Sequence, residues 1–143
     1  MKKRILDCLL VIILIAFTFS CKNEPKQNNT ETTISLEGLT LNNNKKWTAN
    51  KETHVGMKKI DSILKSNSFS DNKLLGEALS KETSYIIKSC NMTGEAHDQL
   101  HIVLVPILEE ITEIKDISNT DELKSKTTNL KRLVSAYFKF FKN

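Results

Sequence analysis

Hydrophobic residues recur at every third or fourth position from about residue 50 to the C-terminus, which is the spacing of one face of an α-helix. Polar stretches rich in the capping residues Ser, Thr, Asn and Asp interrupt this pattern. The sequence therefore predicts four amphipathic helices, over about residues 51–65, 70–90, 93–114 and 118–141. Because their connections are only a few residues long, we expect an all-α, up-down-up-down antiparallel four-helix bundle over residues 50–143.

Each predicted helix has an apolar face that we expect to form the core. In chain order these faces contain Met57, Ile60, Ile63 and Leu64; Leu74, Leu75, Ala78, Leu79, Tyr85 and Ile86; Ala96, Leu100, Val103, Leu104, Ile107, Ile111 and Ile114; and Leu123, Leu130, Leu133, Val134, Tyr137, Phe138 and Phe141. Pro106 lies inside the third pattern, where it removes one backbone hydrogen bond to the carbonyl of Ile102. Because the apolar positions keep their phase across this proline, we expect a bend and not a break.

The segment before the helices has a different pattern. Apolar residues between positions 34 and 41 approximately alternate with polar ones, as in a strand, and asparagines at 42–44 provide a turn back towards Trp47. We therefore expect residues 34–49 to form a short extended or hairpin cap, with Trp47 as an apolar lid over one end of the bundle. Residues 21–33 are too polar to bury a core, and this composition predicts a flexible tether.

Residues 1–20 have the parts of a secretion signal: basic residues at 2–4, a mostly apolar run at 5–19, and a small residue directly before Cys21. This segment resembles a bacterial lipoprotein signal, in which the peptidase cuts before the cysteine and the cysteine thiol carries a diacylglycerol. The resemblance implies that Cys21 is lipidated and attaches the protein to a membrane of the cell envelope, on the periplasmic or the outer-membrane face. The Lys-Asn-Glu sequence at 22–24 is similar to the export signal of Bacteroidetes surface lipoproteins.

Charge and composition limit the classes of function. The chain has 21 Lys and Arg against 17 Asp and Glu, and removal of the three basic and one acidic residues of the signal leaves 18 against 16, a net charge of +2. In this remainder no run of basic residues alternates with aromatic ones, which argues against a nucleic-acid partner. The chain has only four Gly and two Pro, too few for the many turns of an all-β fold.

The predicted topology brings the chemically reactive side chains to one end of the bundle. In an antiparallel arrangement the first and third helices start where the second and fourth helices end. All the histidines, both methionines of the mature chain and its one cysteine besides Cys21 belong to this end. These residues are His54, Met57, Cys90, Met92, His97 and His101.

The densest group lies at the start of the third predicted helix. His97 and His101 are one helical turn apart, so their rings project from the same side and can bind one ion. Imidazole together with soft sulfur ligands suits Cu(I), and imidazole with thiolate also suits Zn(II). We therefore predict a site for copper, or next for zinc. Its ligands are Cys90 and His97, then His101 and Met92, with His54 and Met57 as further candidates.

A metal site without catalytic partners predicts a buffer, chaperone or sensor and not an enzyme. No oxyanion donor or orienting group accompanies Cys90 and His97 in the sequence, as nucleophilic catalysis requires. The main alternative is a structural or adaptor bundle that binds a protein partner in the cell envelope, with histidine and cysteine serving in packing.

Two resemblances concern the bundle itself. It is similar in outline to periplasmic four-helix bundles of the cytochrome b562 type, which implies non-covalent haem binding by histidine and methionine as another alternative. The spacing Cys-x-Met-x-Gly-x-x-His-x-x-Leu-His over residues 90–101, with Lys46-Trp47 upstream, is similar to Bacteroidetes lipoproteins and implies no particular activity.

Overall fold

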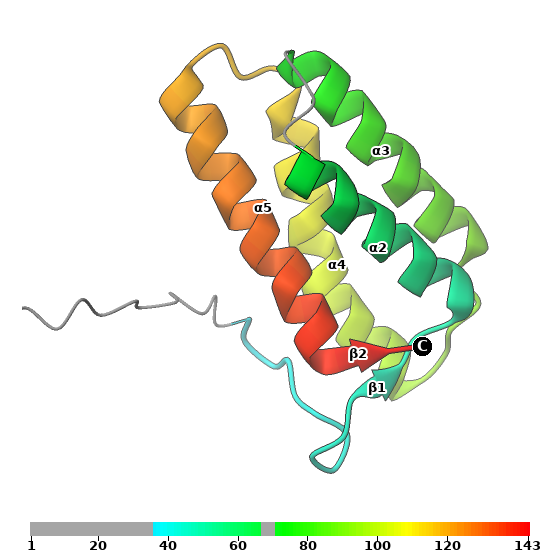
Figure 1. Ribbon diagram of the computed structural model, residues 1–143. Helices are drawn as coiled ribbons and strands as arrows, with labels where there is room; N and C mark the ends of the chain where they lie inside the picture. The colour runs from blue at the N-terminus through cyan, green and yellow to red at the C-terminus, as the bar shows by residue number, and fades with distance from the viewer. Residues whose placement is uncertain (1–35, 67–70) are drawn as a thin grey trace, which may run out of the picture. The chain divides into compact units, whose positions relative to one another are not determined.

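The structure is a computed structural model that describes residues 36–66 and 71–143. Within this part the elements are β1 (Trp47–Thr48), α2 (Lys51–Ser66), α3 (Asn72–Ser89), α4 (Glu95–Ile114), α5 (Thr120–Phe140) and β2 (Phe141–Lys142), as drawn in Figure 1. Helices that follow one another in the chain pack together, and α5 also contacts α2, so the four helices close into a ring. The predicted all-α four-helix bundle is confirmed.

Several of the sequence predictions concern residues that this structure does not describe. The signal at 1–20, the tether at 21–33 and the first two positions of the cap, 34–35, lie outside the described residues. Ser70, which we expect to open the second helix, also lies outside them.

Short polar side chains start two of the helices. Asp71 precedes α3, and its carboxylate accepts a hydrogen bond from the backbone N–H of Lys73 at 2.7 Å. Asn119 precedes α5, and its side-chain oxygen accepts from the backbone N–H groups of Asp121 at 2.8 Å and Glu122 at 3.2 Å. These bonds satisfy backbone donors that have no partner inside the helix, which explains why the polar stretches in the sequence mark the helix boundaries.

The start of α4 uses a glycine instead of a side-chain cap. The sequence predicts that this helix begins at Thr93, but it begins at Glu95, and Gly94 before it has a φ of 66°. This is the left-handed region, which glycine enters without the steric cost that a Cβ imposes. The helix then continues through Pro106 to Ile114 without a break, as the phase of its apolar positions indicates.

The core contains most of the residues that the apolar pattern places inward. Side chains from all four helices and from β2 are fully or nearly fully buried, and the largest fully buried ones are Tyr137, Phe141 and Met57. The expectation is wrong for two residues of α3, because Leu74 is 52% exposed and Tyr85 is 38% exposed. The apolar residues of α3 extend around more of the helix than its buried stripe covers, so hydrophobicity alone does not separate the inner from the outer side.

The strands differ from the expected hairpin. Asn42 and Lys45 exchange backbone hydrogen bonds of 2.9 Å in each direction and form a tight turn, as the asparagines suggest. Trp47, however, pairs in parallel with Phe141 from the far end of the chain. Its indole N–H donates to the carbonyl of Thr40 at 2.7 Å, and its side chain is buried in the core cluster. A two-residue strand has no alternation from which such a long-range pairing can be predicted.

Polar contacts show which helix ends lie together. The side-chain amide of Asn50, directly before α2, donates to the carbonyl of Ser89 at the end of α3 at 2.9 Å. The start of α2 also contacts the end of α5 through His54 and Tyr137. The starts of α2 and α4 and the ends of α3 and α5 therefore form one end of the bundle, which we call the histidine end. In residues 36–66 and 71–143 no helix has the length and apolar character needed to span a membrane.

Candidate metal site at the histidine end

His97 and His101 form a pair on the first turns of α4. Their ring centroids are 4.3 Å apart, and the ring planes are inclined by 58°. His97 is half-buried and His101 is exposed. The two rings are thus close to each other, and neither is fully buried, so an ion can reach them without unfolding of the helix.

The charges around this pair matter because a helix N-terminus carries partial positive charge, which disfavours a bound cation. Two carboxylates in the first turn of α4, Glu95 and Asp98, oppose that charge. The carbonyl of Gly94 accepts hydrogen bonds from the backbone N–H groups of His97 at 2.9 Å and Asp98 at 3.1 Å. The two carboxylates therefore reduce the electrostatic repulsion that the first turn of α4 exerts on a bound cation.

The predicted sulfur ligands lie just before α4. Cys90 is a free thiol, and both Cys90 and Met92 are half-buried against the hydrophobic core. Within the described part of the chain, no group of three or more His, Cys, Asp and Glu side chains lies in an arrangement that could hold a metal ion. The structure thus brings His97 and His101 together, and it gathers no third ligand of these types around them.

His54 has a different environment, because its ring packs against α5. Its Nδ1 atom lies 3.2 Å from the hydroxyl oxygen of Tyr137, and the ring of Phe138 meets it edge-on at a centroid distance of 5.7 Å. Burial lowers the pKa of His54, and the positive charges of Lys58 and Lys46 lower it further. The neutral imidazole is therefore favoured, and with its own proton on Nε2 it accepts a hydrogen bond from the Tyr137 hydroxyl at Nδ1.

Tyr137 is fully buried and stacks on Phe141 with a centroid distance of 5.1 Å and an interplanar angle of 5°. Burial raises the pKa of its hydroxyl, so the hydroxyl stays protonated and serves as a hydrogen-bond donor. Sequence analysis predicts Tyr137 only as a core residue. No local signal connects it with His54, because the two residues are far apart in the chain.

Met57, the last of the predicted ligands, is completely buried in the core. Its thioether therefore packs among apolar side chains, and an ion would have to enter the core to reach it. The six candidate ligands share the histidine end, but they occupy distinct settings: an open imidazole pair, a half-buried sulfur pair, an imidazole bonded to tyrosine, and a core methionine.

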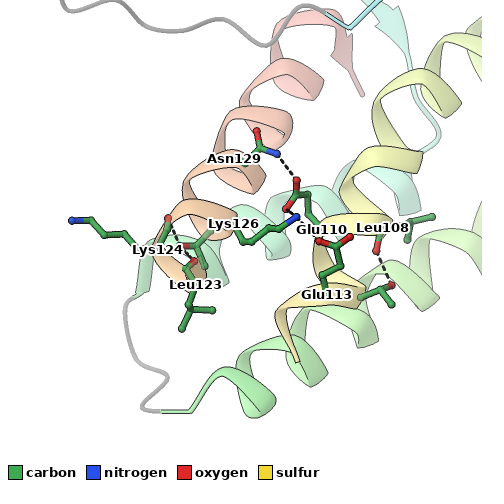
Figure 2. Close-up of polar contacts among 9 residues, drawn as sticks. Leu108, Glu110, Glu113, Leu123, Lys124, Lys126 and Asn129 are labelled. Atoms are coloured by element: carbon green, nitrogen blue, oxygen red, sulfur yellow. Dashed lines mark hydrogen bonds and ion pairs between the residues drawn. The ribbon is translucent and has the colours of Figure 1, made fainter. Parts of the chain in front are cut away.

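A second polar group, which sequence analysis did not identify, joins α4 and α5 away from the histidines. Figure 2 shows Lys126 of α5 between Glu110 and Glu113 of α4, while the side-chain amide of Asn129 donates to Glu110. The hydrogen bond to Glu113, with help from Glu110, raises the pKa of Lys126. One ammonium group thus faces two carboxylates, and these ion pairs and the amide hydrogen bond connect α4 with α5.

Comparisons with known proteins give no relative to guide a functional assignment. No protein-family model, curated protein or solved structure matches this chain.

Proposed function

We propose that this chain is a lipid-anchored protein of the cell envelope whose helical bundle binds a copper or zinc ion through His97 and His101. The observation that carries the metal part is the 4.3 Å separation of the two rings on one side of α4. Imidazole is a common ligand of both metals, and a pair one helical turn apart can hold a single ion. The protein would act as a metal buffer, chaperone or sensor.

Two imidazoles leave coordination positions that other ligands must fill. Cys90 and Met92 are the nearest sulfur donors in sequence to His97, and both lie outside the helices, in the link between α3 and α4. Gly94 in that link already has a backbone conformation suited to a sharp change of direction. Soft Cu(I) would favour recruitment of these sulfur atoms, whereas Zn(II) can complete its coordination with water.

The direct test is a metal titration of the full chain purified without a polyhistidine tag. An ion that binds only the folded state raises its stability, by about 2.7 kcal/mol when free metal is 100 times the dissociation constant. We expect Zn(II), and Cu(I) under reducing conditions, to raise the melting temperature. The double variant His97→Ala, His101→Ala should lose this rise.

His54→Gln is the matched control, because it removes an imidazole at the same end of the bundle while leaving the α4 pair intact. Its metal-induced rise in melting temperature should equal that of the wild type. Cys90→Ser separates the two ions, since loss of the thiolate should weaken Cu(I) binding more than Zn(II) binding. The metal proposal is wrong if the wild type shows no rise or if the double variant shows the same rise.

The lipid anchor is a separate part of the proposal and has its own test. It is supported by the basic, apolar and small-residue succession that ends at Cys21. Intact-mass analysis of the protein from bacterial membranes should show loss of the signal and addition of acyl groups. Cys21→Ser should abolish both changes, and an unchanged mass of the wild type would contradict the anchor.

An adaptor function is the alternative that one further observation favours. The bundle exposes large apolar side chains on neighbouring helices, including Leu74 at 52% and Ile87 at 56% on α3 and Val105 at 45% on α4. Exposed apolar surface of this kind often contacts other proteins. If metal has no effect on stability while Ile87→Lys and Val105→Lys abolish co-purification of an envelope protein, the adaptor function replaces the metal function.

A further inference from the structure

A groove runs between α2 and α5, which lie side by side in Figure 1. It has a volume of about 530 Å³ and is lined by Lys58, Asp61, Lys65, Lys131, Ser135 and Phe138. This volume falls in the range of sites that hold small molecules, which is about 300 to 1,000 Å³. The lining residues come from α2 and α5, whereas the histidine pair is on α4.

The groove has positive charge that the protein does not neutralise. Lys65 pairs with Asp61 at 2.7 Å, and Asp61 is the one carboxylate in the lining. In the described part of the chain, no ion pair joins Lys58 or Lys131 to a carboxylate. Two ammonium groups are therefore available for an anionic ligand.

The charge continues towards the histidine end. The ammonium group of Lys46 donates to the carbonyl of Phe138 at 2.7 Å, which places a further cation beside the groove. The positive charges of Lys46 and Lys58 both lower the pKa of His54, after the larger effect of its burial. The side facing α2 and α5 thus has a positive field, and Phe138 adds an apolar surface within it.

We propose that this groove binds the headgroup of an anionic phospholipid. Lys58 and Lys131 would hold the phosphate oxygens by charge-assisted hydrogen bonds, and the hydroxyl of Ser135 can donate a further one. The half-buried ring of Phe138 would contact the glycerol and the first acyl carbons. An anion without an apolar part would make no apolar contact with that ring.

The choice of a lipid over a soluble phosphate rests on the proposed anchor at Cys21, because an anchored bundle lies beside a bilayer surface. An anionic surface attracts nearby lysine side chains. The groove would then orient the bundle on the membrane and leave α4 facing away from it. Failure of the anchor would appear in the mass of Cys21, whereas the test of the groove uses a soluble lipid and needs no anchor.

The test is an NMR titration of the ¹⁵N-labelled full chain with short-chain dihexanoylphosphatidylglycerol below its micelle concentration. We expect saturable shifts of the backbone amides around Lys58, Ser135 and Phe138. The zwitterionic lipid dihexanoylphosphatidylcholine and inorganic phosphate should each bind at least tenfold more weakly. The double variant Lys58→Gln, Lys131→Gln should weaken binding of the anionic lipid by at least tenfold, since it removes two charges.

The matched control is Lys73→Gln, Lys81→Gln, which removes the same charge from exposed positions of α3. It should bind the lipid as the wild type does, and equal melting temperatures of the two double variants would show that folding is not the cause. The proposal is overturned by shifts elsewhere, by wild-type affinity in the groove variant, or by equal affinity for inorganic phosphate. Tighter binding of a hexaglutamate peptide would also overturn it and would indicate an acidic protein partner instead.

Discussion

The histidine end contains two kinds of histidine that differ in what surrounds the ring. His54 contacts a neighbouring helix, where Tyr137 lies within hydrogen-bonding distance and the Phe138 ring is nearly perpendicular to the imidazole. His97 and His101 contact each other at the open side of α4. Burial and two lysines favour the neutral form of His54, whereas two first-turn carboxylates accompany the α4 pair.

This difference shows that an imidazole's neighbours decide its role more than its position at a given end of a bundle. The bond to Tyr137 occupies Nδ1 of His54 and lets it satisfy a buried hydroxyl. Within residues 36–66 and 71–143, the rings of His97 and His101 contact each other and form no hydrogen bond with another helix, so their lone pairs are better suited to an external ligand. We therefore expect His54 to contribute to the stability of the fold, whereas His97 and His101 are the proposed metal ligands.

The largest expected effect comes from removing the aromatic partner of His54. Tyr137→Ala deletes a fully buried ring that stacks on Phe141, and we expect a loss of about 3 to 5 kcal/mol of unfolding free energy. His97→Ala should change stability by less than about 0.5 kcal/mol, as is usual for substitutions near the surface. Urea unfolding of both variants measures the contrast, and a similar loss in the two would remove the distinction between the histidine settings.

A smaller effect isolates the hydrogen bond from the packing. Tyr137→Phe keeps the ring and removes the hydroxyl that faces His54, so we expect a loss of about 1 kcal/mol. Tyr85→Phe is the matched control, because Tyr85 is exposed and should show no measurable loss. Equal stabilities of Tyr137→Phe and the wild type would mean that the bond contributes nothing beyond the burial of the ring.

The smallest effect is a dependence of stability on pH. The pKa of His54 in the folded protein is lowered from its ordinary value of 6.5, so the unfolded chain binds a proton at higher pH than the folded chain does. This contribution to stability is complete above pH 6.5 and is lost as pH falls below that value towards the lowered pKa. Unfolding experiments between pH 8 and 5 should show a shallower decline for His54→Gln, and an identical slope would contradict the assignment.

Much of the fold follows from the sequence because helix formation is encoded locally. The spacing of apolar residues predicts the four helices. Asn119 is a recognisable start signal because its side chain accepts a hydrogen bond from the backbone at the start of α5. The pairing of Trp47 with Phe141 could not be predicted, since it joins residues close to opposite ends of the described chain through very short strands. The exposure of Leu74 was also missed, because the rotation of α3 about its own axis depends on its neighbours.

In the candidate sites, too, local features could be predicted from the sequence, and contacts between helices could not. The proximity of His97 to His101 follows from the helical repeat within one helix. The contact of His54 with Tyr137 depends on how α2 and α5 meet, which no spacing within either helix contains. For the same reason the groove around Lys58 was missed: the sequence has no basic run there, and the positive charge accumulates only when the two helices lie together.

The parallel pairing of β1 with β2 has a mechanical consequence. Ala49 lies between β1 and α2, and its backbone N–H donates to the carbonyl of Lys142 in β2 at 2.8 Å. A pull on the chain ahead of Trp47 is therefore shared between α2 and the last turn of α5, instead of unwinding α2 alone.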